Sequence, residues 1–230
     1  MSKLSIVIPV FNEKDTLETI LEKVENADFA GLEKEIVLVD DASTDGTLEI
    51  LKRLEEKYKV LYHEKNQGKG AALRTGFAAV TGDIVAIQDA DLEYSPDDYS
   101  PIIKLIVDGK ADVVYGSRFM NVGYSKTAIA ANYFGNKMLT FFTNLLYGAK
   151  LTDMETCYKA FKREVLDGIV IKSDRFDFEP EITAKILKKG IKIVDVPINY
   201  NGRKFDEGKK ITWVDGVHAV IALLKFRFTD

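Results

Sequence analysis

Residues 84–91, Ile-Val-Ala-Ile-Gln-Asp-Ala-Asp, have the pattern of a short buried strand that ends in two carboxylates. An unpaired carboxylate is costly to desolvate, so we expect a cation to compensate Asp89 and Asp91. Mg²⁺ in proteins often combines one or two carboxylates with substrate phosphates. The stretch therefore predicts a strand that delivers a metal–diphosphate site. The alternative is a pair of loop carboxylates that cap the next turn or helix.

Strands and helices alternate around this stretch. Five apolar runs have the length and the β-branched content of strands that a parallel sheet buries on both faces. They are residues 4–10, 36–40, 60–63, 84–88 and 113–116. Between them, helical spacing of apolar residues predicts helices over 15–25, from 45–47 onwards and over 70–80. The alternation predicts a doubly wound, Rossmann-like α/β sheet.

Polar and acidic segments follow three of the predicted strands. They are Asn12-Glu13, Asp40-Asp41 and Asp89–Asp91. In a doubly wound sheet, ligands bind beyond the carboxyl ends of the strands, so these segments should meet at one edge. Their convergence predicts a site for a cation or for a nucleotide base.

Composition limits the class of protein. The chain has 230 residues, 46% of them hydrophobic, and a net charge of −4, which suits an α/β domain and argues against nucleic-acid binding. A single cysteine, Cys157, excludes an internal disulfide and is typical of a reducing compartment. With two histidines and no Cys-x-x-Cys, a zinc site is not expected. Because the first strand begins by Leu4, we expect no signal peptide and a cytoplasmic protein.

Two apolar helices are predicted in the second half, over residues 127–147 and 213–228. In the first, polar residues recur every three to four positions, and that stripe with Lys137 would be costly inside a bilayer, so an interfacial or a buried core helix is expected. The second carries an aromatic-rich face beside Lys225 and Arg227, which suits a membrane surface. That face comprises Trp213, Val217, Val220, Ile221, Leu224 and Phe228. The alternative is a terminal helix packed on the domain.

Several motifs occur in the order and spacing of the family 2 glycosyltransferases. They are Pro9–Glu13, Val39–Thr47, Asn66–Gly70, Asp89–Asp91, Gly116–Phe119 and Asp153–Lys159. Over residues 4–205 the chain resembles the polyprenyl-phosphate sugar synthases, the dolichyl-phosphate mannose and glucose synthase group. The resemblance implies one GT-A-like domain over residues 1–230 with a mostly parallel mixed sheet. Within it, residues 1–120 would bind the nucleotide-sugar and residues 121–230 the acceptor.

The resemblance also implies the donor site. Asp89, Asp91 and Glu93 would hold Mg²⁺ or Mn²⁺, with Glu93 in place of a glutamine that is common in the mannose synthases. The nucleotide-sugar would contact Pro9, Phe11, Glu13, Val39, Asp41, Lys69, Asp89, Ala90, Arg203 and Lys210. In that set the Phe11 ring would lie against base or ribose, Glu13 would accept ribose hydroxyls, and Asp41 would read the base edge.

Structural alternatives exist for the same residues. Pro9 fits a β-bulge and Phe11 a core position, while Glu13 and Asp41 fit helix N-cap carboxylates, which is the favoured interpretation for Glu13 alone. The glycines of 66–70, expected to let backbone approach the nucleotide with Lys69 near a phosphate, also fit a strand-to-helix turn. The basic residues Arg203 and Lys210 fit a solvated loop, in which Lys209 replaces a serine of the group.

Arg118 and Asp153 are the candidates on the acceptor side, and with Asp91 they form the expected catalytic set. A guanidinium matches phosphate oxygens through paired donors, and the resemblance places Arg118 near the acceptor phosphate or the sugar. Asp153 stands where inverting members of the fold carry a carboxylate. Because a phosphate monoester is already anionic near neutral pH, Asp153 would orient groups rather than abstract a proton.

The activity that follows is a metal-dependent, inverting transfer of a hexose to a polyprenyl or dolichyl phosphate. GDP-mannose is favoured as the donor and UDP-glucose stays open. The chain would act peripherally on the cytoplasmic face of the membrane through its two apolar helices, and a homo-oligomer or a separate membrane-anchor subunit stays open. One alternative is transfer to a hydroxyl of a soluble or cell-wall glycan, with Asp153 as the base. Another is a non-catalytic subunit that binds nucleotide-sugar.

Overall fold

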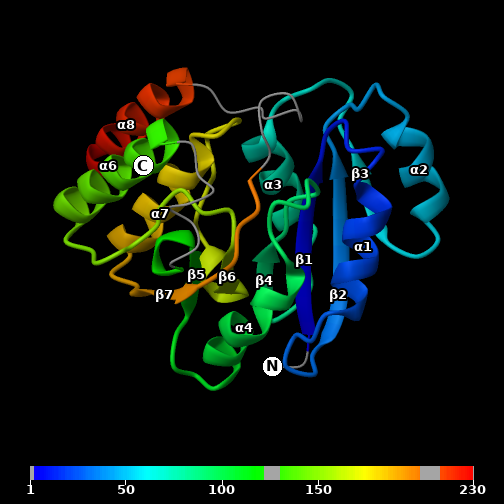
Figure 1. Ribbon diagram of the computed structural model, residues 1–230, viewed down its shortest axis with the longest axis horizontal. Helices are drawn as coiled ribbons and strands as arrows, with labels where there is room; N and C mark the ends of the chain where they lie inside the picture. The colour runs from blue at the N-terminus through cyan, green and yellow to red at the C-terminus, as the bar shows by residue number, and fades with distance from the viewer. Residues whose placement is uncertain (1–2, 122–129, 203–212, 230) are drawn as a thin grey trace.

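A seven-stranded sheet forms the centre of the computed structural model, which describes residues 3–121, 130–202 and 213–229. The strand order is β3-β2-β1-β4-β6-β5-β7 (Figure 1). The strands are β1 (Lys3–Val10), β2 (Glu33–Asp40), β3 (Lys59–Tyr62), β4 (Ile84–Ile87), β5 (Val113–Ser117), β6 (Lys159–Lys162) and β7 (Ile193–Pro197). Strand β6 runs antiparallel to β4 and β5, and the other pairs are parallel.

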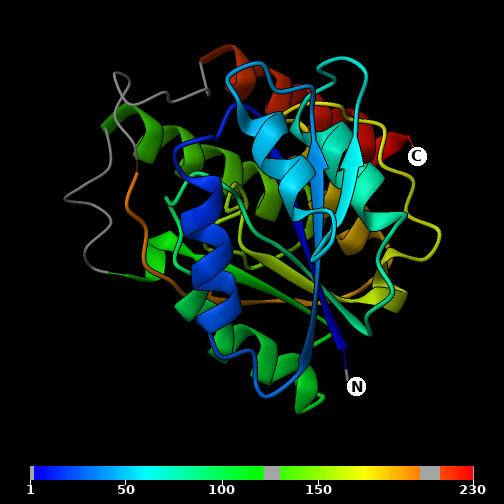
Figure 2. The same ribbon diagram turned by 90° about the vertical axis from the view of Figure 1, so that its right-hand side faces the viewer.

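Helices cover both faces of this sheet (Figure 2). They are α1 (Leu17–Asn26), α2 (Thr47–Leu54), α3 (Lys69–Phe77), α4 (Tyr99–Val107), α6 (Ala130–Tyr147), α7 (Phe178–Lys188) and α8 (Trp213–Phe228). Three 3₁₀ turns join them: η1 (Pro96–Asp98), η2 (Arg118–Met120) and η3 (Arg163–Leu166). In β1, Leu4 and Ile6 pack with α1 and α4, whereas Val7 packs with α3 and α7. Burial on both faces explains why the apolar run of β1 is continuous.

The five predicted strands and the three predicted helices of the first half are confirmed, with ends that differ by a few residues. The expected mixed, mostly parallel sheet is confirmed as well. Strands β6 and β7 and helices α4 and α7 were not predicted. Strand β6 is short and bounded by Lys159 and Lys162, and nothing in the sequence marks Lys159 as fully buried.

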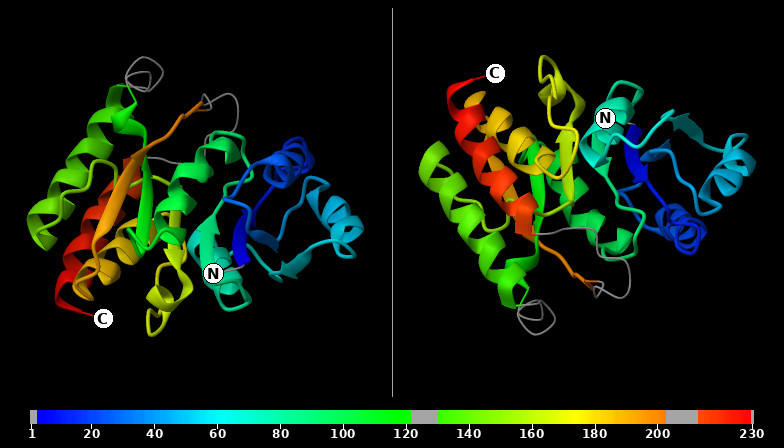
Figure 3. Two further views of the ribbon diagram at one scale, coloured as in Figure 1. Left: turned by 90° about the horizontal axis from the view of Figure 1, so that it is seen from below. Right: turned by 90° about the horizontal axis from the view of Figure 1, so that it is seen from above.

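Helices α6 and α8 lie side by side at the end of the molecule far from α1 and α2 (Figure 3). The Tyr147 hydroxyl donates to the Leu223 carbonyl at 2.7 Å, and Arg227 Nε donates to the Leu146 carbonyl at 3.0 Å. Both predicted helices are therefore present; residues 127–129 of the first lie outside the described residues.

Each of these two helices buries one face and exposes the other. The buried side chains are Leu139, Thr140 and Thr143 of α6 and Ala219, Ala222, Leu223 and Phe226 of α8. The exposed apolar side chains are Phe134, Met138, Phe141, Phe142 and Leu145 of α6 and Val217, Ile221, Leu224 and Phe228 of α8. Of the predicted aromatic-rich face of α8, Val217, Ile221, Leu224 and Phe228 are thus turned outward, whereas Val220 is half-buried and packs against the cluster that contains Leu139 and Leu223. Within the described ranges, no helix has the length and apolar character needed to cross a bilayer.

Candidate active site

The carboxyl ends of β1, β2 and β4 meet at one edge of the sheet, and the backbone there is strained. Asn12, Ala42 and Leu92 follow these strands with φ angles of 54°, 62° and 63°. Such angles are unfavourable for residues that carry a Cβ atom, and strain of this kind concentrates at functional sites. Among the described non-glycine residues, only Ala30 also has a positive φ. The edge predicted to bind ligand is therefore also where the backbone is most constrained.

Asp41 joins the end of β2 to the loop before α3. Its buried carboxylate accepts bonds from the backbone N–H groups of Gln67 at 2.9 Å and Gly68 at 2.7 Å. His63 Nδ1 donates to the same group at 2.7 Å, and His63 Nε2 lies 2.9 Å from the Thr75 hydroxyl. Asp41 thus holds the loop before α3 in place. That Asp41 also recognises the edge of the nucleotide base stays a prediction.

The glycines of the loop before α3 allow close backbone packing. A Cβ atom on Gly68 would lie 2.4 Å from the Asp174 carbonyl oxygen, and one on Gly70 would lie 2.4 Å from that of Ser173. The Ala71 N–H donates to the Asp174 carbonyl at 3.0 Å. The glycines therefore form a strand-to-helix turn that admits the segment 173–175, while their approach to a nucleotide stays a prediction.

Asp89 is compensated by a lysine. Lys69 Nζ lies 2.8 Å and 3.0 Å from its two oxygens, 3.0 Å from Cys157 Sγ and 3.6 Å from Glu179. Burial alone would lower the pKa of Lys69, but the charges around it, that of Asp89 first, raise this pKa well above its ordinary value. Lys69 therefore remains a cation and supplies the positive charge that the buried strand end requires.

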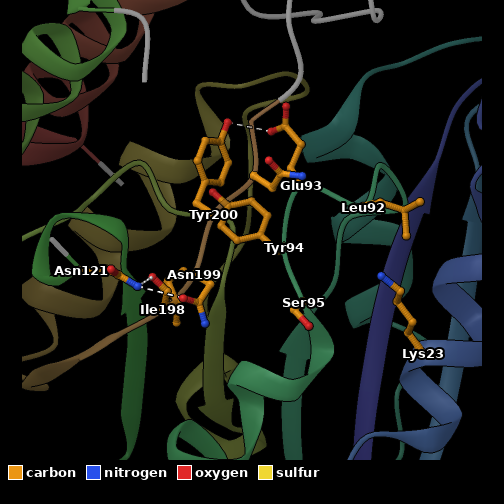
Figure 4. A pocket seen from close by; sticks show the side chains of 10 residues that line it. Lys23, Leu92, Glu93, Tyr94, Ser95, Asn121, Ile198, Asn199 and Tyr200 are labelled. Carbon is orange, nitrogen blue, oxygen red and sulfur yellow. Dashed lines mark hydrogen bonds between the residues drawn. The ribbon is translucent and has the colours of Figure 1, made fainter. Parts of the chain in front are cut away.

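Asp91 and Glu93 belong to one turn. The Glu93 N–H donates to Asp91 Oδ1 at 3.0 Å, and the Tyr200 hydroxyl donates to Glu93 Oε2 at 2.8 Å (Figure 4). In the described part of the chain, no three His, Cys, Asp or Glu side chains are arranged to hold a metal ion. Carboxylate oxygens nevertheless suit Mg²⁺ or Mn²⁺ when a diphosphate completes the ligand set. The predicted set of Asp89, Asp91 and Glu93 therefore stays a proposal.

Arg118 and Asp153 form a buried bidentate pair. Arg118 Nε and Nη2 donate to the two Asp153 oxygens at 2.7 and 2.8 Å, and the Arg118 backbone N–H adds a bond of 3.0 Å. The guanidinium also lies over the Tyr200 ring, with Cζ 5.3 Å from the ring centroid. A carboxylate that accepts three bonds from one residue is suited to hold that residue in place. The predicted acceptor candidates are thus brought together.

The remaining predicted residues fall into four groups. Val39 and Ala90 are buried, and Pro9 and Phe11 are half-buried. Glu13 precedes α1, where its Oε2 accepts the Thr16 hydroxyl at 2.7 Å and its carbonyl accepts the Leu17 N–H at 2.9 Å. The N-cap residue of α1 is Thr16, and the Glu13 carboxylate bonds a hydroxyl rather than a helix N–H, so the interpretation of Glu13 as an N-cap carboxylate is not confirmed. Arg203 and Lys210 lie outside the described residues.

Three charged residues between the donor and acceptor groups were not singled out from the sequence. Lys159 Nζ is bound by the Glu179 carboxylate and donates to the Met154 carbonyl at 3.1 Å. Glu155 Oε1 is buried and has no hydrogen-bond partner among the described residues. Burial first, and then the charge of Glu179, raise the pKa of Glu155 to about 8. Glu155 and Lys159 belong to the Asp153–Lys159 motif, but no local signal marks the burial of these residues, because it depends on α7 packing under β6.

A cavity of about 320 Å³ lies beside the Asp91 turn. Figure 4 shows Tyr94, Asn121, Asn199 and Tyr200 on its walls, with Lys23 of α1 on the opposite side. The Asn121 amide donates to the Asn199 side chain at 2.9 Å. Tyr94 and Tyr200 give this cavity an aromatic wall next to the carboxylates.

A mixed α/β sheet with acidic residues beyond the carboxyl ends of its strands belongs to the class of folds that bind their ligands at that edge. The family model for glycosyl transferase family 2 matches residues 5–170, and the chain belongs to this family. It is a glycosyltransferase, as predicted.

Two curated relatives resemble the chain in sequence. The dolichol-phosphate mannosyltransferase of Pyrococcus furiosus is 32% identical over 216 residues, covering 90% of this chain and 59% of the relative, so the chain spans about three-fifths of that protein. The UDP-N-acetylglucosamine–dolichyl-phosphate N-acetylglucosaminyltransferase of Methanococcus voltae is 29% identical over 213 residues, covering 84% of this chain and 83% of the relative.

Solved structures support the fold. Glucosyl-3-phosphoglycerate synthase from Mycobacterium tuberculosis, in complex with Mn²⁺, UDP and glucosyl-3-phosphoglycerate, has a TM-score of 0.73 at 20% identity. The match covers 100% of this chain and 81% of that one. The same enzyme with Mg²⁺ and UDP gives a TM-score of 0.71. The expected GT-A fold is confirmed.

Proposed function

We propose that this glycosyltransferase transfers a hexose from a nucleotide-sugar to a polyprenyl phosphate, with inversion at the anomeric carbon. The observation that carries the proposal is the Arg118–Asp153 pair. Both Asp153 oxygens accept bonds from Arg118, so Asp153 is poorly placed to take a proton from a hydroxyl acceptor. A phosphate acceptor needs no base, and a guanidinium is the group that would attract it. The names of both curated relatives, which contain dolichol- or dolichyl-phosphate, support the same class of acceptor.

On the donor side, the chain would hold the diphosphate against the edge that carries Asp89 and Asp91. Mg²⁺ or Mn²⁺, bound by Asp91 and Glu93 with Asp89, would supply Lewis-acid stabilisation of the leaving diphosphate. Lys69 keeps Asp89 compensated, and a phosphate oxygen would join Asp89, Cys157 and Glu179 as a further partner of its ammonium group. Arg203 and Lys210 would complete the phosphate contacts, and Phe11, Glu13 and Asp41 would contact the nucleoside. GDP-mannose is the favoured donor.

The acceptor lipid would be met at a membrane surface. The exposed apolar sides of α6 and α8 lie on adjacent helices, with Lys137, Lys225 and Arg227 as cations of the same two helices. Apolar side chains flanked by basic ones suit the interface of an anionic bilayer. We therefore propose peripheral association on the cytoplasmic face through these two helices. A homo-oligomer or a separate anchor subunit would use the same apolar side chains.

The test measures transfer of radiolabelled sugar into an organic-extractable lipid. The protein is incubated with polyprenyl phosphate in detergent and with labelled GDP-mannose, UDP-glucose or UDP-N-acetylglucosamine in parallel. We expect label in the lipid phase from one donor, lost on addition of EDTA and in Asp91→Asn. Hydrolysis of the donor with no labelled lipid from any of the three would contradict the proposal.

A further inference from the structure

The turn that carries Asp91 holds a strained residue at its centre. Leu92 has a φ angle of 63°, a left-handed conformation that its Cβ atom makes unfavourable. Such a conformation persists only where surrounding contacts hold it. Within the turn, the Glu93 N–H donates to Asp91 Oδ1 at 3.0 Å, so the direction of the Asp91 carboxylate depends on where Glu93 is held.

Glu93 is bound by two residues that follow strand β7 and are distant from it in the sequence. The Tyr200 hydroxyl donates to Glu93 Oε2 at 2.8 Å, and the Asn201 N–H donates to the Glu93 carbonyl at 2.8 Å. Side chain and backbone of Glu93 are thus both bound by the segment that follows β7.

The ring of Tyr200 meets the acceptor side of the site. The Arg118 guanidinium carbon lies 5.3 Å from its centroid, and the Tyr94 ring centroid lies 5.1 Å away. A Cβ atom on Gly202 would come within 2.6 Å of the ring, so glycine at 202 lets the backbone close over it. Figure 4 shows the Tyr200 ring beside Tyr94, with its hydroxyl directed to Glu93.

We propose that Tyr200 is a positioning residue that fixes the Asp91 turn and the Arg118 guanidinium relative to each other. Its hydroxyl acts on the donor side through Glu93, and its ring acts on the acceptor side by a cation–π contact. The two effects are separable, because phenylalanine keeps the ring and loses only the hydroxyl. The inference rests on the proposed function for its acceptor half, whereas its donor half requires only that the chain binds a nucleotide-sugar.

Steady-state kinetics of Tyr200→Phe and Tyr200→Leu test this coupling. For Tyr200→Phe we expect kcat to fall about tenfold and the donor KM to rise, with the acceptor KM unchanged. For Tyr200→Leu we expect the acceptor KM to rise about tenfold in addition. Because the hydroxyl acts through Glu93, Tyr200→Phe should add nothing further in a Glu93→Ala background.

The matched control is Tyr58→Phe. The Tyr58 hydroxyl donates to Glu25 at the same 2.8 Å, but it precedes the amino end of β3, away from the ligand edge. This variant should have wild-type kinetics. Thermal unfolding of each variant separates a loss of folded protein from a loss of rate.

Three results would overturn the inference. The first is wild-type kinetics in Tyr200→Phe. The second is a loss of activity in Tyr200→Phe that is fully explained by a smaller fraction of folded protein. The third is a double variant in which the effects of Tyr200→Phe and Glu93→Ala on the rate are fully additive. If the wild-type protein transfers no sugar to polyprenyl phosphate, the proposed function fails. The role of Tyr200 is then tested by calorimetry, which measures the affinity of each variant for the nucleotide-sugar. Weaker donor binding in Tyr200→Phe than in Tyr58→Phe would still support its role, and equal binding would refute it.

Discussion

The proposed donor and acceptor sides of the candidate site are built by different means. On the proposed donor side, Asp41 directly follows β2 and Asp89 comes two residues after β4, and their partners Gln67, Gly68 and Lys69 come from the loop and helix after β3. On the proposed acceptor side, Arg118 and Asp153 are 35 residues apart in the sequence and form a buried ion pair. The difference teaches that the donor edge follows from strand–turn geometry, whereas the acceptor side depends on a buried ion pair. Substitutions on the proposed donor side should therefore lower the rate of transfer, whereas substitutions on the proposed acceptor side should first lower the stability of the fold.

The largest expected effect is on the donor side. Asp91→Asn keeps the shape of the side chain but removes its charge, so the leaving diphosphate would lose its main source of stabilisation. We expect kcat/KM for transfer to fall about 10³-fold, with unchanged thermal stability. Initial rates with labelled donor measure this. A fall of less than about tenfold would mean that Asp91 does not act on the leaving group.

On the acceptor side, the first effect is on folding. Asp153→Asn leaves the Arg118 guanidinium buried without its counter-charge, which costs about 3 kcal/mol of unfolding free energy. Urea denaturation measures the change. Glu18→Gln is the control, because it removes the exposed Arg53–Glu18 pair and should leave the midpoint in place. Equal midpoints for the two variants would show that the buried pair does not stabilise the acceptor side.

A titration effect is expected at Glu155, between the two sides. Its pKa in the folded protein is about 8 against an ordinary value of 4.5, so the folded state retains a proton that the unfolded chain releases. Stability therefore falls as pH rises from about 4.5 to about 8, by up to about 1.4 kcal/mol per pH unit. Glu155→Gln removes this loss and should be more stable than wild type at pH 8 but not at pH 4. Unfolding midpoints across this range measure it, and a difference that does not change with pH would contradict the assignment.

The smallest expected effect concerns the outer surface of the acceptor side. Phe141 and Phe142 of α6 are 58% and 37% exposed, so their replacement by serine should spare the fold. We expect binding to anionic vesicles and transfer to the lipid to fall about tenfold, with donor affinity unchanged. Val107→Ser, at a residue 39% exposed on α4, is the control and should bind vesicles as wild type does. Equal losses of lipid transfer and donor binding would point instead to a core helix.

The same contrast explains what the sequence could predict. Strands β1, β2 and β4 and the carboxylates after them were predictable, because a continuous apolar run and the residue at its end are local features. The pairing of Lys69 with Asp89 and the burial of Lys159 were not, because they depend on helix α7, which packs across the sheet. The outward side of α8 was identified by its spacing, but only packing shows that Ala222 and Phe226 face the core. Tyr200 carries no local signal, since its partners Glu93 and Arg118 come from distant segments.

The central claim is best tested by letting three acceptors compete for one labelled sugar. Polyprenyl phosphate, the corresponding polyprenol without phosphate, and 3-phosphoglycerate are offered at equal concentration with the preferred donor and Mn²⁺. If Asp153 orients Arg118 towards a phosphate nucleophile, label should enter polyprenyl phosphate alone, in a linkage released by mild acid. Label on the polyprenol or on the hydroxyl of 3-phosphoglycerate would contradict the account and make Asp153 a general base.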